Sequence, residues 1–203
     1  MSTDLLAAVK FLLILAIPVV AIVLLVYFQR KAQLDAWNEL AVRTGLTCEG
    51  GIAPWSPIHV SGSYHGRPLV LDTFTRGTGK RSRTYTRAVL GVNNPIPLQL
   101  YLSEESVFDK VGKWMGSKDI QLGDEALDRR YKIKGEPEEE VGRVLASLDV
   151  RQKLSEAPSM RVEIQAGEVH AEKFGVTKKV EELEKMFGLL NALAEGVERI
   201  AGA

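Results

Sequence analysis

The sequence is organised around one long apolar stretch near its N-terminus, Phe11-Leu-Leu-Ile-Leu-Ala-Ile-Pro18-Val-Val-Ala-Ile-Val-Leu-Leu-Val-Tyr27-Phe28. It contains no charged or amide side chain, and Tyr27 carries its only hydroxyl group. As a helix with a ~1.5 Å rise per residue it covers about 27 Å, close to the ~30 Å hydrocarbon core of a bilayer. A core helix that is apolar on all sides needs more apolar chain around it than this sequence offers. Residues 11–28 therefore predict one transmembrane helix in contact with the lipid bilayer.

The flanks of this stretch indicate a retained anchor rather than a cleaved signal peptide. A secretory signal has an apolar core of about 7–15 residues, followed by small residues at the cleavage site. Here the apolar core is longer and ends in Tyr27-Phe28-Gln29-Arg30-Lys31, which contains no small residue. We expect residues 1–31 to form the signal anchor of a single-pass membrane protein.

The basic residues beside the stretch predict its direction in the membrane. Lys10 precedes it, whereas Arg30, Lys31 and, farther along, Arg43 follow it. Flanks rich in Lys and Arg tend to stay in the cytoplasm, so this small difference places residues 30–203 there.

Composition narrows the classes of function. Lys and Arg total 26, as do Asp and Glu, so the formal net charge is zero and does not favour a nucleic-acid partner. Cys48 is the only cysteine, which excludes an intramolecular disulfide. His59, His65 and His170 are scattered without the spacing of metal ligands. The sequence predicts no catalytic residue, no cofactor, no metal site and no nucleic-acid partner.

Beyond the anchor, residues 32–176 predict an α+β domain with a largely antiparallel sheet. Residues 34–44 form an apolar helical stripe, and Gly45 is suited to end that helix. Because no helix breaker follows Phe28, we expect the membrane helix to continue as a stalk whose Trp37 face docks onto the domain. Alternating apolar and polar residues predict strands. The expected strands are 58–64, 68–75, 84–92, 98–102, 118–122, 130–134, 160–165 and 168–172, and the expected helices are 104–116 and 135–148.

The chain closes with a predicted amphipathic helix over residues 177–203. Its apolar residues alternate steps of three and four, which is the a/d pattern of a helix-packing seam. The seam residues are Val180, Leu183, Phe187, Leu190, Ala194 and Val197. Such a stripe must be buried, either on its own domain or against another copy or partner, and the sequence leaves both open.

A glycine-rich basic loop follows the second predicted strand. Its residues Arg76-Gly-Thr-Gly-Lys80-Arg-Ser resemble a phosphate loop only superficially, because the first glycine of that pattern is Phe74 here and Arg81 follows the lysine. The loop is either a solvated hairpin tip or a contact for anionic lipid or an acidic partner. The candidate contact residues are Arg76, Lys80, Arg81, Arg83 and Arg87.

Asp124 and Asp128 are the other candidate for chemistry. Two nearby carboxylates can hold a cation or form an acid–base pair. Gly123-Asp124 is also typical of a turn, and Asp128 is followed by Arg129 and Arg130, which could pair with it. We favour the turn and ion-pair interpretation.

Three groups of residues also resemble a known kind of protein. They are Trp37-x-x-Leu40-Ala41-x-x-x-Gly45, Gly62-x-Tyr64-x-Gly66-Arg67 and Gly123-Asp124-x-x-Leu127-Asp128-x-x-Tyr131. In this order, over about residues 34–170, they resemble uncharacterised bacterial membrane-anchored proteins built on a domain of unknown function. Leu127 departs from the pattern, in which an aromatic residue is expected. The resemblance implies an anchored α+β domain and no particular activity.

Together these patterns predict an anchored protein whose cytoplasm-facing domain acts by protein or lipid interaction, as a scaffold or accessory subunit of a membrane complex. Its expected partners are the bilayer, anionic lipid, and a membrane protein or a second copy of the chain. The alternative is a membrane-tethered hydrolase or ligand-binding domain that uses the Asp124/Asp128 region. The sequence does not establish enzymatic activity.

Overall fold

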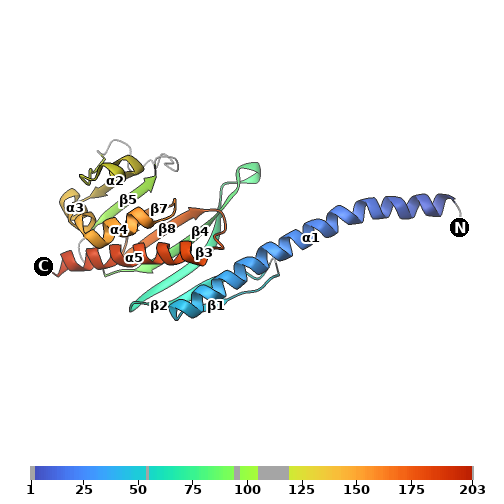
Figure 1. The fold of residues 1–203 in the computed structure, drawn as a ribbon, viewed down its shortest axis with the longest axis horizontal. Helices are drawn as coiled ribbons and strands as arrows, with labels where there is room; N and C mark the ends of the chain where they lie inside the picture. The colour runs from blue at the N-terminus through green and yellow to red at the C-terminus, as the bar shows by residue number, and fades with distance from the viewer. Residues whose placement is uncertain (1–2, 54, 94–96, 105–118, 203) are drawn as a thin grey trace.

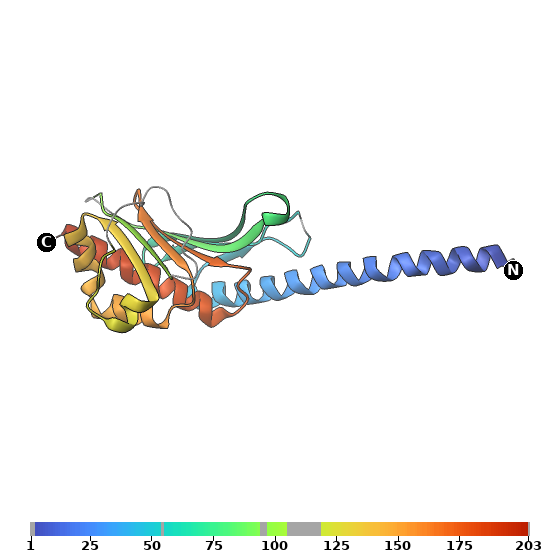
Figure 2. The same cartoon turned by 90° about the horizontal axis from the view of Figure 1, so that it is seen from above.

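A computed structural model describes residues 3–53, 55–93, 97–104 and 119–202. A long N-terminal helix projects from one end of an α+β domain, in which helices cover one face of a single antiparallel sheet (Figures 1 and 2). The predicted fold class is therefore confirmed.

Helix α1 runs without interruption from Thr3 to Thr44, with Pro18 inside it. It passes through residue 31, the predicted boundary between anchor and domain. Gly45 ends it with a φ of 71°, and the amide of Leu46 donates to the carbonyl of Ala41 at 2.9 Å. This is the predicted glycine cap, since a left-handed residue turns the chain and bonds a carbonyl that the helix leaves free.

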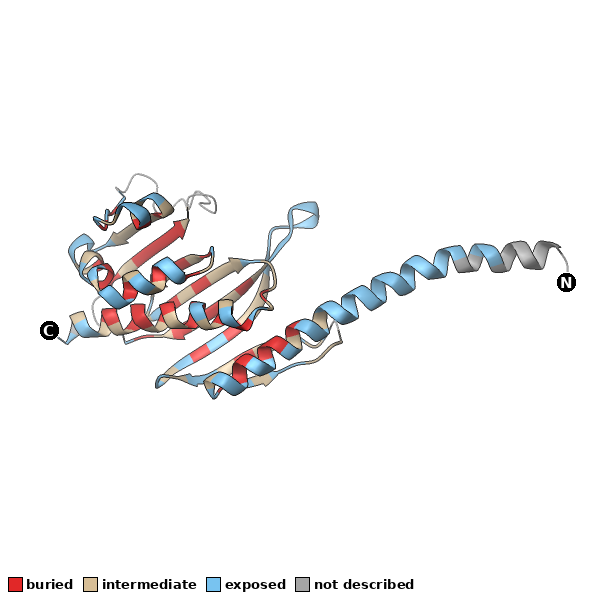
Figure 3. Ribbon diagram, in the orientation of Figure 1, coloured by how far each residue is buried: buried red, intermediate tan, exposed pale blue. Residues whose placement is uncertain are grey.

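The second half of α1 docks onto the domain, as the predicted stalk should. Trp37 and Leu40 are fully buried, and Ala41 is nearly so. The indole Nε1 of Trp37 donates to the carbonyl of Thr177 at 2.9 Å. Figure 3 shows the change along the helix from exposed residues to buried ones.

The sheet has eight strands in the order β1-β2-β3-β4-β8-β7-β5-β6, and all neighbours are antiparallel. The strands are β1 (Thr47–Glu49), β2 (His59–Tyr64), β3 (Arg67–Arg76), β4 (Arg83–Gly91), β5 (Gln99–Glu104), β6 (Tyr131–Glu136), β7 (Arg161–Gln165) and β8 (Glu168–Phe174). The late β7–β8 hairpin lies between β4 and β5, so it joins two parts of the chain that are otherwise separate in the sheet.

Tight turns join β2 to β3 and β7 to β8. Their central residues, His65-Gly66 and Ala166-Gly167, all have positive φ angles of 50–81°. Two consecutive residues with positive φ form the type I′ turn that matches the twist of a two-stranded hairpin.

The helices pack on one face of the sheet. They are α2 (Glu125–Arg130), α3 (Glu138–Ala146), α4 (Leu148–Glu156) and α5 (Val180–Ala201). Helix α5 contacts α1, α3, α4 and strands β4 and β8, so it lies at the centre of the core. The sheet face beneath the helices carries a register row of buried apolar side chains, Leu71, Ala88, Ala171, Val162, Leu102 and Ile133.

Several expected elements differ from the structure. The expected helix over 135–148 is α3, which begins only after Pro137 and ends at Ala146, and a further helix, α4, follows at once. Residues 119–122 form no strand, although the amide of Ile120 donates to the carbonyl of Ile133 at 2.8 Å. The expected helix over 104–116 lies outside the described residues, except for Glu104, which ends β5.

Candidate membrane-facing site

The basic loop is the tip of the long β3–β4 hairpin. The tip contains a short helical turn, η1 (Gly79–Arg81), and Lys80, Arg81 and Arg83 are exposed. Gly77 has a φ of 90°, and a Cβ there would lie 2.7 Å from the carbonyl oxygen of Arg81. Glycine is therefore required for the chain to turn this tightly.

The structure divides the five predicted contact residues into two groups. Arg87 bonds Asp72 through two hydrogen bonds of 2.9 and 2.5 Å, and this bonding raises the pKa of its guanidinium group. Arg76 bonds both carboxylate oxygens of Glu172, at 3.1 and 3.0 Å. Both arginines therefore lie in ion pairs on the open face of the sheet rather than free at the tip.

The remaining three, Lys80, Arg81 and Arg83, have no carboxylate within ion-pair distance among the residues that the structure describes. They line a shallow hollow of about 460 Å³ together with Arg76, Gly77 and Tyr85. A hollow with this many cationic walls suits an anionic group, because charge-assisted hydrogen bonds to phosphate or carboxylate are the strong ones.

An aromatic cluster supports the tip from the open face of the sheet. Phe74 stacks on Tyr85 with ring centroids 5.5 Å apart, and Tyr85 meets Phe174 edge-on at 5.7 Å. The guanidinium of Arg76 lies 5.3 Å from the Phe74 centroid and 5.4 Å from that of Tyr85. These cation–π contacts hold the base of the hairpin, so the tip extends from a fixed platform.

The tip points toward the end of the domain from which the apolar half of α1 emerges. Figures 1 and 2 agree on this placement, which brings two segments far apart in the sequence to the same end of the molecule. In the part of the chain that the structure describes, α1 is the one helix long and apolar enough to cross a membrane. The predicted lipid contact and the predicted membrane span therefore lie on the same side.

Asp124 and Asp128 have backbone roles. Asp124 caps α2 by accepting from the amides of Ala126 and Leu127, at 3.0 and 3.2 Å. Asp128 accepts from the amides of Leu122 and Gly123, at 2.6 and 3.0 Å.

The turn interpretation of the two aspartates agrees with these bonds, but the expected pairing of Asp128 with its basic neighbours is wrong. Arg129 pairs with Glu125 at 2.7 Å instead. Arg130 pairs with Glu104 at 2.7 Å and bonds the carbonyls at the end of α4. Each arginine therefore meets a different carboxylate on the folded surface.

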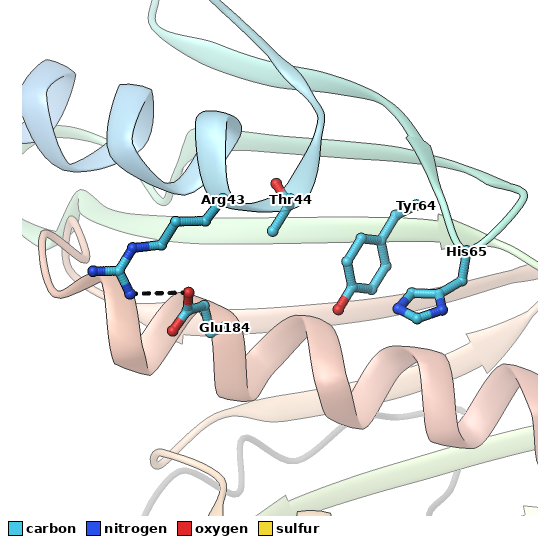
Figure 4. A pocket seen from close by; sticks show the side chains of 5 residues that line it. All are labelled: Arg43, Thr44, Tyr64, His65 and Glu184. Carbon is cyan, nitrogen blue, oxygen red and sulfur yellow. Dashed lines mark hydrogen bonds and ion pairs between the residues drawn. The ribbon is translucent and has the colours of Figure 1, made fainter.

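A second hollow, of about 450 Å³, lies between the end of α1, β2 and α5 (Figure 4). Its walls are Arg43, Thr44, Tyr64, His65 and Glu184. Arg43 bonds Glu184 at 3.2 Å, and burial together with the charge of Glu184 raises the pKa of Tyr64. A protonated phenol and a paired guanidinium offer hydrogen bonds rather than an acid–base pair.

His65 and Cys48, which the sequence offers as isolated reactive side chains, have structural roles. His65 lies in the β2–β3 turn, with a φ of 50°. Cys48 in β1 packs partly against the core, and burial raises the pKa of its thiol. Among the described residues, no three of His, Cys, Asp and Glu group closely enough to hold a metal ion.

The six seam residues of the C-terminal helix lie in the core of a single chain. Each is at most 6% exposed, and the ring of Phe187 meets that of Tyr64 edge-on at 5.4 Å. Three residues outside the a/d pattern, Met186, Leu189 and Leu193, are equally buried. Helix α5 is therefore covered on more than one side, as a central core helix is.

The loop between β1 and β2 carries an exposed residue that the sequence patterns do not predict as a site. Trp55 in this loop is 85% exposed, and Arg30 of α1 donates to the carbonyls of Gly51 and Ser56, at 2.9 and 2.5 Å. The one sequence feature that points to this loop is a tryptophan within a segment that contains Gly and Pro. Its meaning depends on the position of the loop beside α1, which the sequence does not give.

A scan against protein families and a search of curated proteins both find no match to this chain. Among solved structures, the fold is similar to the crystal structure of the mycobacterial trehalose monomycolate transport factor A, TtfA. The TM-score is 0.53 at 11% sequence identity, and the alignment covers 85% of this chain and 94% of TtfA. At this identity the likeness concerns the fold alone.

Proposed function

We propose that this chain is a single-pass membrane protein that acts by interaction, as a scaffold or accessory subunit of a membrane complex. The observation that carries the proposal is the continuity of α1. Its apolar half has the length and composition of a membrane span, and its second half is built into the domain core through the buried Trp37. A domain joined in this way has a fixed height and orientation at the membrane, which suits a protein that presents a surface.

The basic hairpin tip adds a lipid contact to this proposal. A cytoplasmic leaflet carries anionic lipid, and each Lys or Arg near its surface contributes about 1 kcal/mol to binding. The tip of the β3–β4 hairpin lies toward the end of the domain from which the apolar stretch emerges, and its residues Lys80, Arg81 and Arg83 are exposed. We place the domain on the cytoplasmic side, with this tip against anionic headgroups.

The structural neighbour supports an accessory role. TtfA is, by its description, a transport factor for trehalose monomycolate. On the basis of the shared fold we propose that this chain assists a membrane transport complex. We do not propose that it shares the substrate named for TtfA. The resemblance to bacterial membrane-anchored proteins with a domain of unknown function, noted from the sequence, also stays a proposal.

The alternative, a hydrolase or ligand-binding domain at Asp124 and Asp128, is not favoured. Both carboxylates accept hydrogen bonds from backbone amides, and those bonds define the start of α2. These bonds occupy the carboxylate oxygens in holding the backbone of this turn, which is the role that the geometry supports.

The test is crosslinking of the full-length tagged chain in native membranes, followed by purification in detergent. The proposal expects one or a few integral membrane proteins in amounts comparable to the chain itself. The hydrolase alternative expects the chain alone, together with a turnover that Asp124→Asn abolishes. Recovery of the chain alone with such a turnover would contradict the proposal.

A further inference from the structure

The loop between β1 and β2, of which the structure describes residues 50–53 and 55–57, is held against α1 directly after the apolar stretch. Arg30 donates to carbonyls near both ends of the loop, those of Gly51 and Ser56. At the base, Gly50 has a φ of 114°, and a Cβ there would lie 2.2 Å from the carbonyl oxygen of Pro57. The loop is therefore closed by a close backbone approach and held against the helix.

The apolar side of this loop lies beside the last turns of the predicted span. Ile52 and Ala53 share an apolar hollow of about 380 Å³ with α1 residues Ile22, Val23, Val26 and Tyr27. At ~1.5 Å per residue, Ile22 lies about 9 Å before Phe28, the end of the apolar stretch. The loop therefore does not stop at the end of the span but runs alongside its last turns.

Polar side chains on α1 show where the apolar stretch meets water. Gln29 accepts a hydrogen bond from Lys178, and Arg30 and Lys31 follow it on α1. These groups begin where the apolar stretch ends, so the membrane surface lies close to residue 28. Ile52 and Ala53, which line one hollow together with residues of the 22–27 segment, then lie on the lipid side of that surface.

Trp55 completes the arrangement. Its side chain is 85% exposed, although hydrogen bonds from Arg30 hold the loop to which it belongs. Tryptophan is enriched at membrane–water interfaces, where its ring meets acyl chains and its N–H meets water or headgroups. Irregular backbone is costly next to lipid because its polar groups need partners, and Arg30 supplies partners to two of the carbonyls.

We propose that residues 50–53 and 55–57 form a membrane foot, which inserts Ile52 and Trp55 into the headgroup region of the same leaflet that α1 leaves. The occupant of the hollow between the loop and α1 is phospholipid. Surface-bound amphipathic segments bury their apolar side by about 5–10 Å, which matches the overlap of the loop with the span. The domain then touches the bilayer at a second point besides α1, and this rests on the proposed membrane anchor.

The test is quenching of tryptophan emission by brominated lipids in nanodiscs that hold the full-length chain. A Trp114→Phe background leaves Trp37, which is fully buried in the domain core, and Trp55. The foot predicts that phospholipids brominated near the headgroup quench part of the emission. It also predicts that Trp55→Phe in the same background removes this quenching.

Two matched pairs of variants test how the foot is held. Arg30→Gln removes the bonds to the loop and should reduce the quenching, whereas Lys31→Gln changes the same charge one residue later and should not. Gly50→Ala should reduce the quenching because its Cβ meets Pro57. Gly66→Ala, at a positive φ of 79° with open space around it, should leave it unchanged.

Three outcomes would overturn the inference. Quenching that is the same with and without Trp55 in carbonate-resistant membranes would reject the foot and leave the anchor intact. Release of the chain by carbonate would reject both the anchor and the foot. Crosslinking through residue 55 to a second copy or another membrane protein, with Trp55 shielded from brominated lipid, would assign the hollow to a protein partner instead.

Discussion

The two halves of α1 are one continuous helix in two different environments. In the first half, from Phe11 to Phe28, the large apolar side chains that the structure describes are 41–68% exposed. In the second half, Trp37 and Leu40 are fully buried against the domain. A helix that is apolar all round needs apolar surroundings on every side, whereas a helix with one apolar face needs only one surface to pack on. The following predictions test this difference.

The largest expected effect concerns the side of the membrane on which the docked half lies. Because Arg30 and Lys31 follow the span and only Lys10 precedes it, the domain should stay in the cytoplasm. Protease added to intact cells should leave a C-terminal tag uncut, and permeabilised cells serve as the control in which it is digested. Complete digestion in intact cells would show the opposite orientation.

Trp37→Ala should have the largest effect on stability. Truncating a buried Trp costs about 3–5 kcal/mol, and the bond to the carbonyl of Thr177 is lost as well. The free energy of unfolding, measured by denaturant titration of the full chain in micelles, should fall by this amount.

The matched control is Leu24→Ala in the exposed half of the same helix. It should change the stability of the domain by less than about 0.5 kcal/mol, since Leu24 is 49% exposed and lies outside the domain core. Equal effects of the two variants would mean that the two halves do not differ as described.

Phe187→Ala tests the surface on which α1 docks. Phe187 is fully buried in α5, so the free energy of unfolding of the variant should fall by about 3–5 kcal/mol. Its mass in solution should stay the same. Leu148→Ala, at an 85% exposed position in α4, should be nearly neutral. A change of mass by light scattering without a change of stability would assign the seam to contacts between chains.

The smallest expected effect concerns the lipid contact at the hairpin tip. Fragment 32–203 should bind phosphatidylserine vesicles, and replacing Lys80, Arg81 and Arg83 with Ser should weaken binding by about 3 kcal/mol, or roughly 100-fold. Binding should also fall with added salt, because exposed charges are screened over about 10 Å at 0.1 M.

The control for the tip removes basic residues from the helical layer, with Arg129→Ser and Arg143→Ser. These exposed residues pair with Glu125 and Glu139 on their own helices, so vesicle binding should be unaffected. If both sets weaken binding equally, the domain has no preferred lipid-facing side.

Local patterns predicted most of the elements. The period of two predicted the long strands, and the a/d steps predicted α5 and six of the residues that it buries. Among the missed elements, α4 has nine residues, whereas β1 and α2 are shorter. Strand β1 has three residues and α2 has six, too few for a periodic pattern, and the capping bonds of Asp124 define α2 more than its apolar residues do.

The candidate site was predicted only in part, because charges that are close in sequence separate in the fold. Arg76, Lys80 and Arg87 belong to one basic run, yet a strand row pairs Arg87 with Asp72, and Glu172 from β8 pairs with Arg76. Glu172 lies far along the chain from the hairpin. No local pattern could have predicted which of these charges remain free.

The sequence by itself determined the apolar span, the glycine that ends α1, and which side of each strand and of α5 is apolar. These properties follow from side-chain order along one element. Only the tertiary structure decided what each apolar side meets. Trp37 bonds Thr177, 140 residues away, and Arg30 bonds the carbonyls of Gly51 and Ser56 in the loop beside the apolar stretch. Periodicity specifies that a face must be buried, whereas the partner depends on how distant segments pack, and packing is a property of the whole chain.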